Sequence, residues 1–265
     1  MKKLVLALSA VAAFTGSALA ADLPARTYTK APMMAPVYNW TGFYIFGGGG
    51  YGMFDSNTFV TTFPAGTPLT IGQKVGGDGY FGTVGAGYDW QFSGSWVAGI
   101  FADGQFGSIK GSLTDPTFLL GGASGSVKDK TNVAAGVRLG YLVAPNVYSY
   151  VNGGYSYAEF SGSTLVSNVT GVAGATTPSF HRNGWFVGGG VENSLNIFGI
   201  AAPGWFMKTE YRSAFYDRIT LPETFTPAFG GGLATNAVTF KPWVQTISTS
   251  LVYRFNWTGP VVAKY

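Results

Sequence analysis

Residues 80–92 read YFGTVGAGYDWQF and alternate between two kinds of side chain. One face carries Tyr80, Val84, Ala86, Tyr88, Trp90 and Phe92, and the other carries Thr83, Gly85, Gly87, Asp89 and Gln91. A period of two is that of a β-strand, whose successive side chains point to opposite faces of the sheet. The stretch therefore predicts a strand with an apolar outer face that meets lipid and an inner face of small and polar residues.

Seven other segments repeat this alternation, although aromatic residues on both faces leave the faces of the first and fifth open, and the connections between the eight are alternately long and short. Bacterial outer-membrane barrels have this rhythm, with tight periplasmic turns, long extracellular loops and both chain ends in the periplasm. We therefore predict an all-β fold, an eight-stranded antiparallel up-and-down transmembrane β-barrel. The approximate strands are Phe43–Phe54, Tyr80–Phe92, Trp96–Ser108, Lys130–Val143, Val147–Phe160, His181–Ser194, Gly204–Asp217 and Pro242–Phe255.

The composition also favours a barrel over a soluble domain. Hydrophobic residues make up 46% of the chain and charged residues only 11%, against about 25% charged in ordinary globular domains. Lipid offers no hydrogen-bond partners, so spanning strands must pair on both sides, and closing the sheet removes its unpaired edges. The 40 glycines fall largely inside the strands, because a strongly curved wall needs small inward residues.

The first 20 residues are typical of a secretory signal peptide, with Lys2 and Lys3 before an apolar core and a small-residue cleavage site at Ala18–Ala20. A retained membrane anchor is the alternative interpretation. Residues 21–38 contain three prolines and no sustained period, which predicts a periplasmic lead-in. Residues 39–265 then form the barrel. Removing the two lysines from the 16 basic residues leaves 14 against 12 acidic ones, without the basic cluster that a nucleic-acid partner would need.

Charged residues on the predicted inner faces balance in sign. An isolated buried charge is costly, complementary neighbours reduce that cost, and eight strands enclose only enough room for side chains. We therefore predict a lumen plugged by ion pairs, and a water-filled pore whose charges select ions is the alternative. The inward residues are Asp89, Asp103, Glu192 and Glu210 against Arg138, Lys208, Arg212 and Arg254.

Aromatic and basic residues are predicted to gather where the barrel meets water. The periplasmic aromatics are Trp40, Trp90, Phe92, Trp96, Trp205, Tyr253 and Trp257, and the outer ones are Tyr80, Phe106, Tyr157, Phe215 and Trp243. Cations near the outer rim are suited to the phosphates of lipopolysaccharide, although solvated loop charges are the simpler interpretation of each. These cations are Lys110, Lys128, Lys130, Arg182 and Lys241.

Chemistry at a conventional active site is not expected. His181 is the only histidine and lies beside Ser179 and Arg182, but a nucleophile needs a base within reach and usually a third group that orients it. The chain has no cysteine and no Cys/His cluster for a metal, and we expect no cofactor. Residues 47–52 match G-x-G-x-x-G, but they lie inside a predicted strand rather than at the start of a helix.

Three sequence segments resemble a known family. They are Ala21–Pro24 after the signal, Tyr38–Ile45 (YNWTGFYI) before and within the first strand, and Leu251–Phe255 (LVYRF) in the last strand. Over essentially the whole chain they resemble the small outer-membrane β-barrel proteins of alphaproteobacteria, often labelled porin family or outer-membrane immunogenic proteins. The resemblance implies a barrel similar to the OmpA transmembrane domain, assembled by the outer-membrane insertion machinery through an aromatic residue near the end. The candidates for that signal are Tyr253, Phe255 and Tyr265.

These observations predict a non-enzymatic protein of the bacterial outer membrane that contributes to envelope integrity. Its partners would be outer-membrane lipid and lipopolysaccharide, and its polar loops would offer a surface to host or phage factors. A narrow diffusion porin is the first alternative, and a lipid-modifying surface enzyme is the second.

Overall fold

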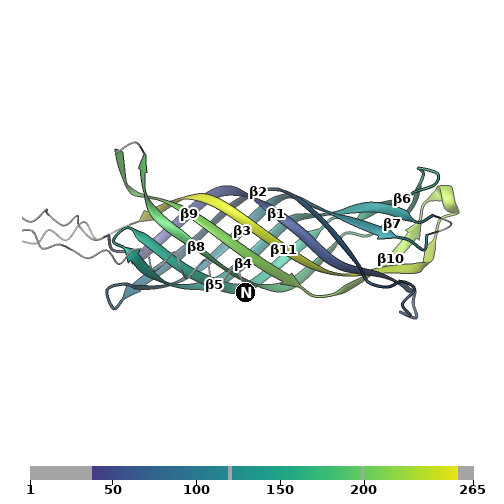
Figure 1. Cartoon of the computed structure of the whole chain (residues 1–265), viewed down its shortest axis with the longest axis horizontal. Coiled ribbons are helices and arrows are strands. Elements are labelled where there is room, and N and C mark those ends of the chain that lie inside the picture. The colour runs from purple at the N-terminus through teal and green to yellow at the C-terminus, as the bar shows by residue number, and fades with distance from the viewer. Residues whose placement is uncertain (1–37, 119–120, 198–199, 256–265) are drawn as a thin grey trace, which may run out of the picture. The chain divides into compact units, whose positions relative to one another are not determined.

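The computed structural model describes residues 38–118, 121–197 and 200–255, and they form one antiparallel sheet that closes on itself (Figure 1). Eight long strands make the ring, in the order β1-β2-β3-β4-β5-β8-β9-β11, and β11 pairs with β1 to close it. This confirms the predicted fold class. The long strands are β1 (Gly42–Thr62), β2 (Gln73–Phe92), β3 (Trp96–Asp115), β4 (Ala123–Ala144), β5 (Val147–Phe160), β8 (Phe180–Ile197), β9 (Ile200–Tyr216) and β11 (Leu233–Phe255).

The connections are short at one end of the ring. Residues 93–95 join β2 to β3 and residues 145–146 join β4 to β5, so this end is the periplasmic one. The predicted length of the connection at residues 195–203 was wrong, because β8 continues to Ile197 and β9 begins at Ile200. That segment lacks strong alternation, and cross-strand pairing decides its conformation instead.

The other end carries more regular structure than expected. Six of the eight ring strands extend beyond their predicted bounds at this end, and three short strands form within the predicted loops: β6 (Ser163–Ser167), β7 (Ala173–Thr177) and β10 (Ile219–Phe225). A 3₁₀ turn, η2, covers Pro227–Phe229. Strand β6 pairs with β4 and β7, and β10 pairs with β7 and β11, beyond one end of the ring (Figure 1). We call this part the extracellular extension.

The alternation correctly predicted the two faces of the wall. On β2, Tyr80 and Trp90 are 79% and 63% exposed on the outside, whereas Asp89 is fully buried within. On β1, aromatic residues occupy both alternating positions, so the sequence did not assign its two faces. In the structure, Phe43 and Ile45 point outward, and Tyr44 and Phe46 point inward. A wall that is apolar outside and polar or aromatic inside is the reverse of a soluble protein.

Some inward glycines make room for aromatic rings from other strands. A Cβ at Gly87 would lie 2.5 Å from the ring of Tyr44, and one at Gly111 would overlap the ring of Phe54. Glycine opposite an aromatic residue therefore lets a narrow barrel hold large side chains across its interior.

Several predictions concern residues outside the described ranges. These are the signal peptide at 1–20, the lead-in up to residue 37, and Trp257 and Tyr265. The last residue of the lead-in, Tyr38, packs on Phe206 with their ring centroids 4.8 Å apart. Among the described residues, no helix has the length and apolar character needed to cross a membrane.

Candidate functional site

Four charged residues meet inside the ring toward its periplasmic end, and we call them the periplasmic cluster: Asp89, Arg138, Glu192 and Arg254. Arg138 donates from Nε to Asp89 Oδ1 at 2.9 Å and from Nη1 to Glu192 Oε2 at 3.3 Å. Arg254 donates from Nε to Glu192 Oε1 at 2.6 Å, and its Nη2 lies 2.7 Å from Asp89 Oδ2. Each guanidinium therefore contacts both carboxylates, and the cluster connects β2, β4, β8 and β11 across the lumen.

Aromatic rings enclose this cluster. The Arg138 guanidinium lies 4.2 Å from the centre of the Tyr44 ring, and that of Arg254 lies 4.5 Å from the centre of the Trp40 ring. The Trp40 carbonyl also accepts a hydrogen bond from Arg254 Nη1 at 3.3 Å. Trp40 is thus 1% exposed inside the barrel, and its predicted place at the membrane interface was wrong. A cation over a ring face is stabilised, more so where water is excluded.

A second set of charges, the central cluster, lies further along the lumen and comprises Asp103, Lys208, Glu210 and Arg212. Arg212 donates to both oxygens of Asp103, at 2.9 and 2.6 Å, and to Glu210 Oε1 at 2.9 Å. Lys208 Nζ lies 3.6 Å from Glu210 Oε2, which also accepts from the Tyr150 hydroxyl at 2.8 Å. A guanidinium that donates two hydrogen bonds to one carboxylate forms a strong and directional ion pair.

Two further layers fill the lumen beyond the central cluster. Asn132, Ser156 and Tyr216 hydrogen-bond to one another, with Ser156 Oγ 2.9 Å from both Asn132 Oδ1 and the Tyr216 hydroxyl. Beyond them Phe160 stacks on Phe180 with ring centroids 4.9 Å apart. Phe54 and Phe240 complete this aromatic layer, at 6.0 Å from Phe160 and 5.0 Å from Phe180.

The structure places all eight inward charges that the sequence analysis named inside the barrel, and each forms at least one ion pair. The aromatic and neutral polar residues packed around these charges were not predicted from the sequence. Their signal was present in the alternation, since Tyr148 and Tyr150 share a face of β5 with the inward Asn152. It could not be interpreted because that strand also carries aromatics on its outer face.

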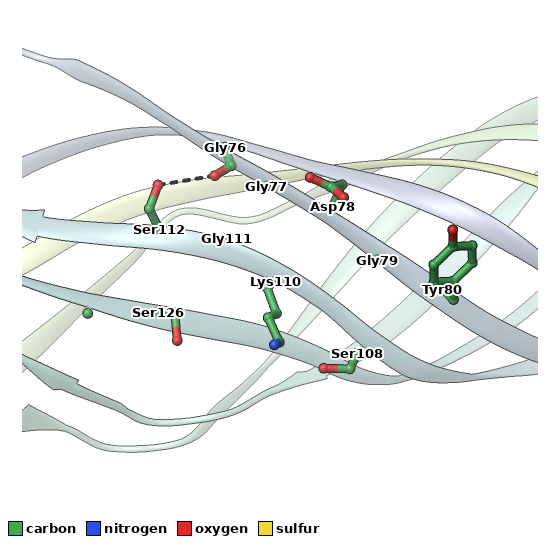
Figure 2. A pocket seen from close by; sticks show the side chains of 11 residues that line it. Gly76, Gly77, Asp78, Gly79, Tyr80, Ser108, Lys110, Gly111, Ser112 and Ser126 are labelled. Atoms are coloured by element: carbon green, nitrogen blue, oxygen red, sulfur yellow. Dashed lines mark hydrogen bonds between the residues drawn. The ribbon is translucent and has the colours of Figure 1, made fainter.

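Outside the wall, a hollow of about 670 Å³ lies over the outer halves of β2, β3 and β4 (Figure 2). We call it the glycine hollow; it is lined by Gly76, Asp78, Lys110, Ser112 and Ser126 among others. Lys110, Lys128, Lys130 and Lys241 all point outward and are exposed. Arg182 does not join them, because it lies on the inward-facing side of β8 and its Nε is buried. Its predicted contact with outer lipid therefore has no support from the geometry.

His181 lies on the outward side of β8, and its ring stacks on that of Tyr157 with centroids 5.6 Å apart. Within the described ranges, no hydroxyl hydrogen-bonds the imidazole, and no group of three or more His, Cys, Asp or Glu residues is placed to hold a metal. Tyr253 and Phe255 lie at the periplasmic end of β11 with ring centroids 4.9 Å apart, and Phe255 pairs with Phe43.

A closed ring of long antiparallel strands, with lipid-facing apolar residues and a charged interior, defines a β-barrel protein of the bacterial outer membrane. The family model of the autotransporter β-domain matches residues 25–197. The 31 kDa outer-membrane immunogenic protein of Brucella melitensis is 32% identical over 220 residues, which cover 80% of this chain and 85% of the relative, and the Brucella suis protein of that name matches equally. The chain therefore belongs to the autotransporter β-domain family and to the family of the 31 kDa outer-membrane immunogenic proteins.

A solved structure supports the fold. The outer membrane protein OprG from Pseudomonas aeruginosa superposes with a TM-score of 0.52 at 14% identity, covering 83% of this chain and 100% of that one. At this identity the likeness concerns the fold alone. Together with the family relationship it places the chain in the bacterial outer membrane.

Proposed function

We propose that this barrel is a non-enzymatic anchor in the outer membrane whose lumen does not conduct, and that it contributes to envelope integrity. The observation that carries the proposal is the set of seven ion pairs among eight buried charged side chains. Five of these pairs join different strands, and the Asp103–Arg212 pair connects β3 to β9 on opposite sides of the ring, so an open path would require several of them to break. Breaking one buried pair by removing a partner typically costs about 3–5 kcal/mol.

The aromatic layers support the same proposal. A water path along the axis would have to pass Tyr44 and Tyr148 at one level and Phe160 and Phe180 at another, and these side chains are buried. Filled interiors are expected for eight strands, whose barrel is only wide enough for side chains.

The extracellular extension and its connections would form the surface that meets the environment, including host or phage factors. The name of the Brucella relatives describes those proteins as immunogenic, which supports an exposed surface here. Assembly through the insertion machinery would use the aromatic end of β11, at Phe255 or beyond it.

Planar-bilayer conductance of the refolded protein tests the sealed lumen. We expect no steady current from the native barrel. Regular open steps in the native protein would contradict the seal and favour the diffusion porin. Arg212→Ala should lower the unfolding midpoint, whereas a marked rise in conductance with unchanged folding would favour a selective pore. Arg218→Ala, an exposed cation outside the lumen, is the matched control.

The absence of enzyme activity has its own test. His181→Ala should leave the lipid composition of membranes containing the protein unchanged relative to the native chain. A lipid product made by the native protein and lost in His181→Ala would overturn the non-enzymatic proposal.

A further inference from the structure

The outer wall changes from apolar to polar just above its aromatic residues. Tyr51 on β1 and Tyr80 on β2 pack against each other with ring centroids 5.0 Å apart, at the level expected of the outer aromatic belt. Asp78 follows on the same face of β2 and accepts a hydrogen bond from the Tyr51 hydroxyl. The glycine hollow therefore begins where hydrocarbon gives way to lipid headgroups.

Strand register makes the hollow a shared feature of neighbouring strands. Trp243 of β11 pairs with Asp55 of β1, and Asp55 pairs in turn with Gly76 of β2. The Ser112 hydroxyl of β3 donates to the Gly76 carbonyl at 3.1 Å, and Ser112 pairs with Ser126 of β4. The residues Trp243, Asp55, Gly76, Ser112 and Ser126 thus form one row across five strands. Gly76 lies at the centre of the row, and because glycine has no side chain the surface is open there (Figure 2).

Unneutralised cations border this row. Lys110 and Lys128 are direct cross-strand partners on the outer face, an arrangement that is destabilising when nothing lies between the charges. Lys74 and Lys241 flank Asn57 in the row above. In the part of the chain that the structure describes, none of these four lysines forms an ion pair. Lys110 extends away from Asp78 (Figure 2), whose carboxylate is held by Tyr51.

A bulge in β4 creates this arrangement. Lys130 has no partner on β5 between the pairs formed by Asp129 and Thr131, so the strand gains one residue there. Below the bulge Asn132 and Ala134 point inward, and above it Val127 and Asp129 do. The extra residue turns Lys128 and Ser126 outward, so β4 presents the Ser126 hydroxyl to the hollow and places Lys128 beside its lining residue Lys110, rather than in the lumen.

We propose that the glycine hollow binds the phosphorylated sugar headgroup of an outer-leaflet glycolipid. Lys110 and Lys128 would hold a phosphate through charge-assisted hydrogen bonds, and Ser112, Ser126 and Asp78 would meet sugar hydroxyls. A smaller hollow of about 200 Å³ lies along the same row of paired residues and is lined by Asp55, Lys74, Lys241 and Trp243 among others. The inference rests on the proposed envelope role, because it gives that role a specific lipid contact.

The test uses the full barrel, refolded in detergent and titrated with diphosphoryl lipid A while native mass spectrometry counts the bound lipid. Lys110→Gln with Lys128→Gln should weaken binding about tenfold or more, since each charge-assisted hydrogen bond contributes at least 1.4 kcal/mol, a factor of about ten. Arg182→Gln, which removes a cation on the inward side, is the matched control and should bind as the native barrel does.

Competing probes distinguish the sources of phosphate. Phosphatidylglycerol and inorganic phosphate should displace lipid A poorly, because neither presents sugar hydroxyls. Equal displacement by phosphatidylglycerol would overturn the sugar site in favour of a general anionic surface. Equal displacement by inorganic phosphate would overturn the lipid assignment.

A second variant tests the hollow without removing a charge or altering a buried residue. Ser126→Phe places a ring in the hollow from an exposed position and should also reduce lipid A binding, whereas unchanged binding would overturn the assignment. Conductance of the native barrel is recorded in parallel. A conducting barrel that still retains lipid A contradicts the seal alone, and a silent barrel without retention contradicts the lipid site alone.

Discussion

At the scale of single residues, the buried cations differ in how many carboxylates each one contacts. Arg138 contacts two carboxylates and lies over Tyr44, so its loss leaves Asp89 and Glu192 with only Arg254 between them. Lys208 has one carboxylate at 3.6 Å, and Glu210 keeps Arg212 and Tyr150 without it.

We therefore expect Arg138→Met to lower the free energy of unfolding by about 3–5 kcal/mol, and Lys208→Met to change it by less than about 1 kcal/mol. The reason is that Arg138 hydrogen-bonds two buried carboxylates, whereas the one carboxylate near Lys208 keeps two other hydrogen-bond partners. Urea titration of the refolded barrel in lipid vesicles, followed by tryptophan fluorescence, measures both. Equal losses in the two variants would contradict the unequal roles.

Glu223 is a buried carboxyl group in the extracellular extension. It lies on β10 and is fully buried, and its two oxygens have no hydrogen-bond donor in the described part of the chain. Burial, followed by the nearby charge of Asp115, raises the pKa of Glu223 from 4.5 to about 8. The folded extension therefore retains a proton that the unfolded chain releases above about pH 4.5.

The sign of the pH effect follows from that difference in pKa. Raising the pH from 4.5 to 8 favours the unfolded form of the extension, and above pH 8 the penalty is constant. We expect trypsin to cut at Arg218, next to β10, faster at pH 8 than at pH 6 after correction for enzyme activity. Glu223→Gln should remove most of this difference, whereas Glu159→Gln, at an exposed carboxylate, should keep it. A pH difference that survives in Glu223→Gln would show that another group is responsible.

At the scale of the strand, glycine and aromatic residues work as pairs across neighbouring strands. Gly87 of β2 pairs with Tyr44 of β1, and the space at Gly87 lets the Tyr44 ring reach Arg138. A methyl group there would overlap both the Tyr44 ring and the backbone carbonyl oxygen of Ile100 on β3.

Gly87→Ala should therefore destabilise the barrel by about 1–3 kcal/mol, the usual cost of forcing extra volume into a packed interior. Gly82→Ala is the matched control, since its added Cβ would meet its nearest neighbours at 3.8 Å, an ordinary contact. Unfolding midpoints of both variants in the same vesicles check the expectation. An equal cost at both positions would mean that backbone effects of glycine, rather than the Tyr44 ring, set the stability.

At the scale of the molecule, closure makes each strand dependent on two neighbours rather than on chain connectivity. Strand β11 pairs with β1 from Phe43–Phe255 to Thr62–Asn236 and with β9 on its other side. A cut at Arg218, in the exposed connection before β10, separates β11 from the other ring strands in sequence but not in space.

We expect a barrel cut at Arg218 to migrate as a folded species on an unheated gel and to separate into two fragments after boiling. The ladders on both edges of β11 would hold the fragments together, because lipid offers its backbone no other partners. Release of the C-terminal fragment without heating would contradict the closed ring.

Features set by residues close together in the sequence could be predicted, and features set by contacts between distant residues could not. The eight ring strands and their order were predicted, as were the faces of the strands with clear alternation, because alternation is local and because closure is required in lipid. The faces of β1 and β5 stayed open, since both strands carry aromatic residues on each face. The extracellular extension was missed, because β6 and β7 are short segments of small residues without an aromatic face, and pairing with β4 and β10 stabilises them. The position of Trp40 was missed because it precedes β1, where no alternation assigns a face.

By itself, the amino-acid sequence determined that the chain forms an outer-membrane barrel and that the eight paired charges point into it, since both depend on neighbours one or two residues away. Only the tertiary structure decided which charges meet, that tyrosines and Trp40 enclose them, and that a bulge turns Lys128 toward the outside. The physical reason is distance along the chain. Arg212 and Asp103 are 109 residues apart in sequence, and only the register of the closed sheet brings their side chains together.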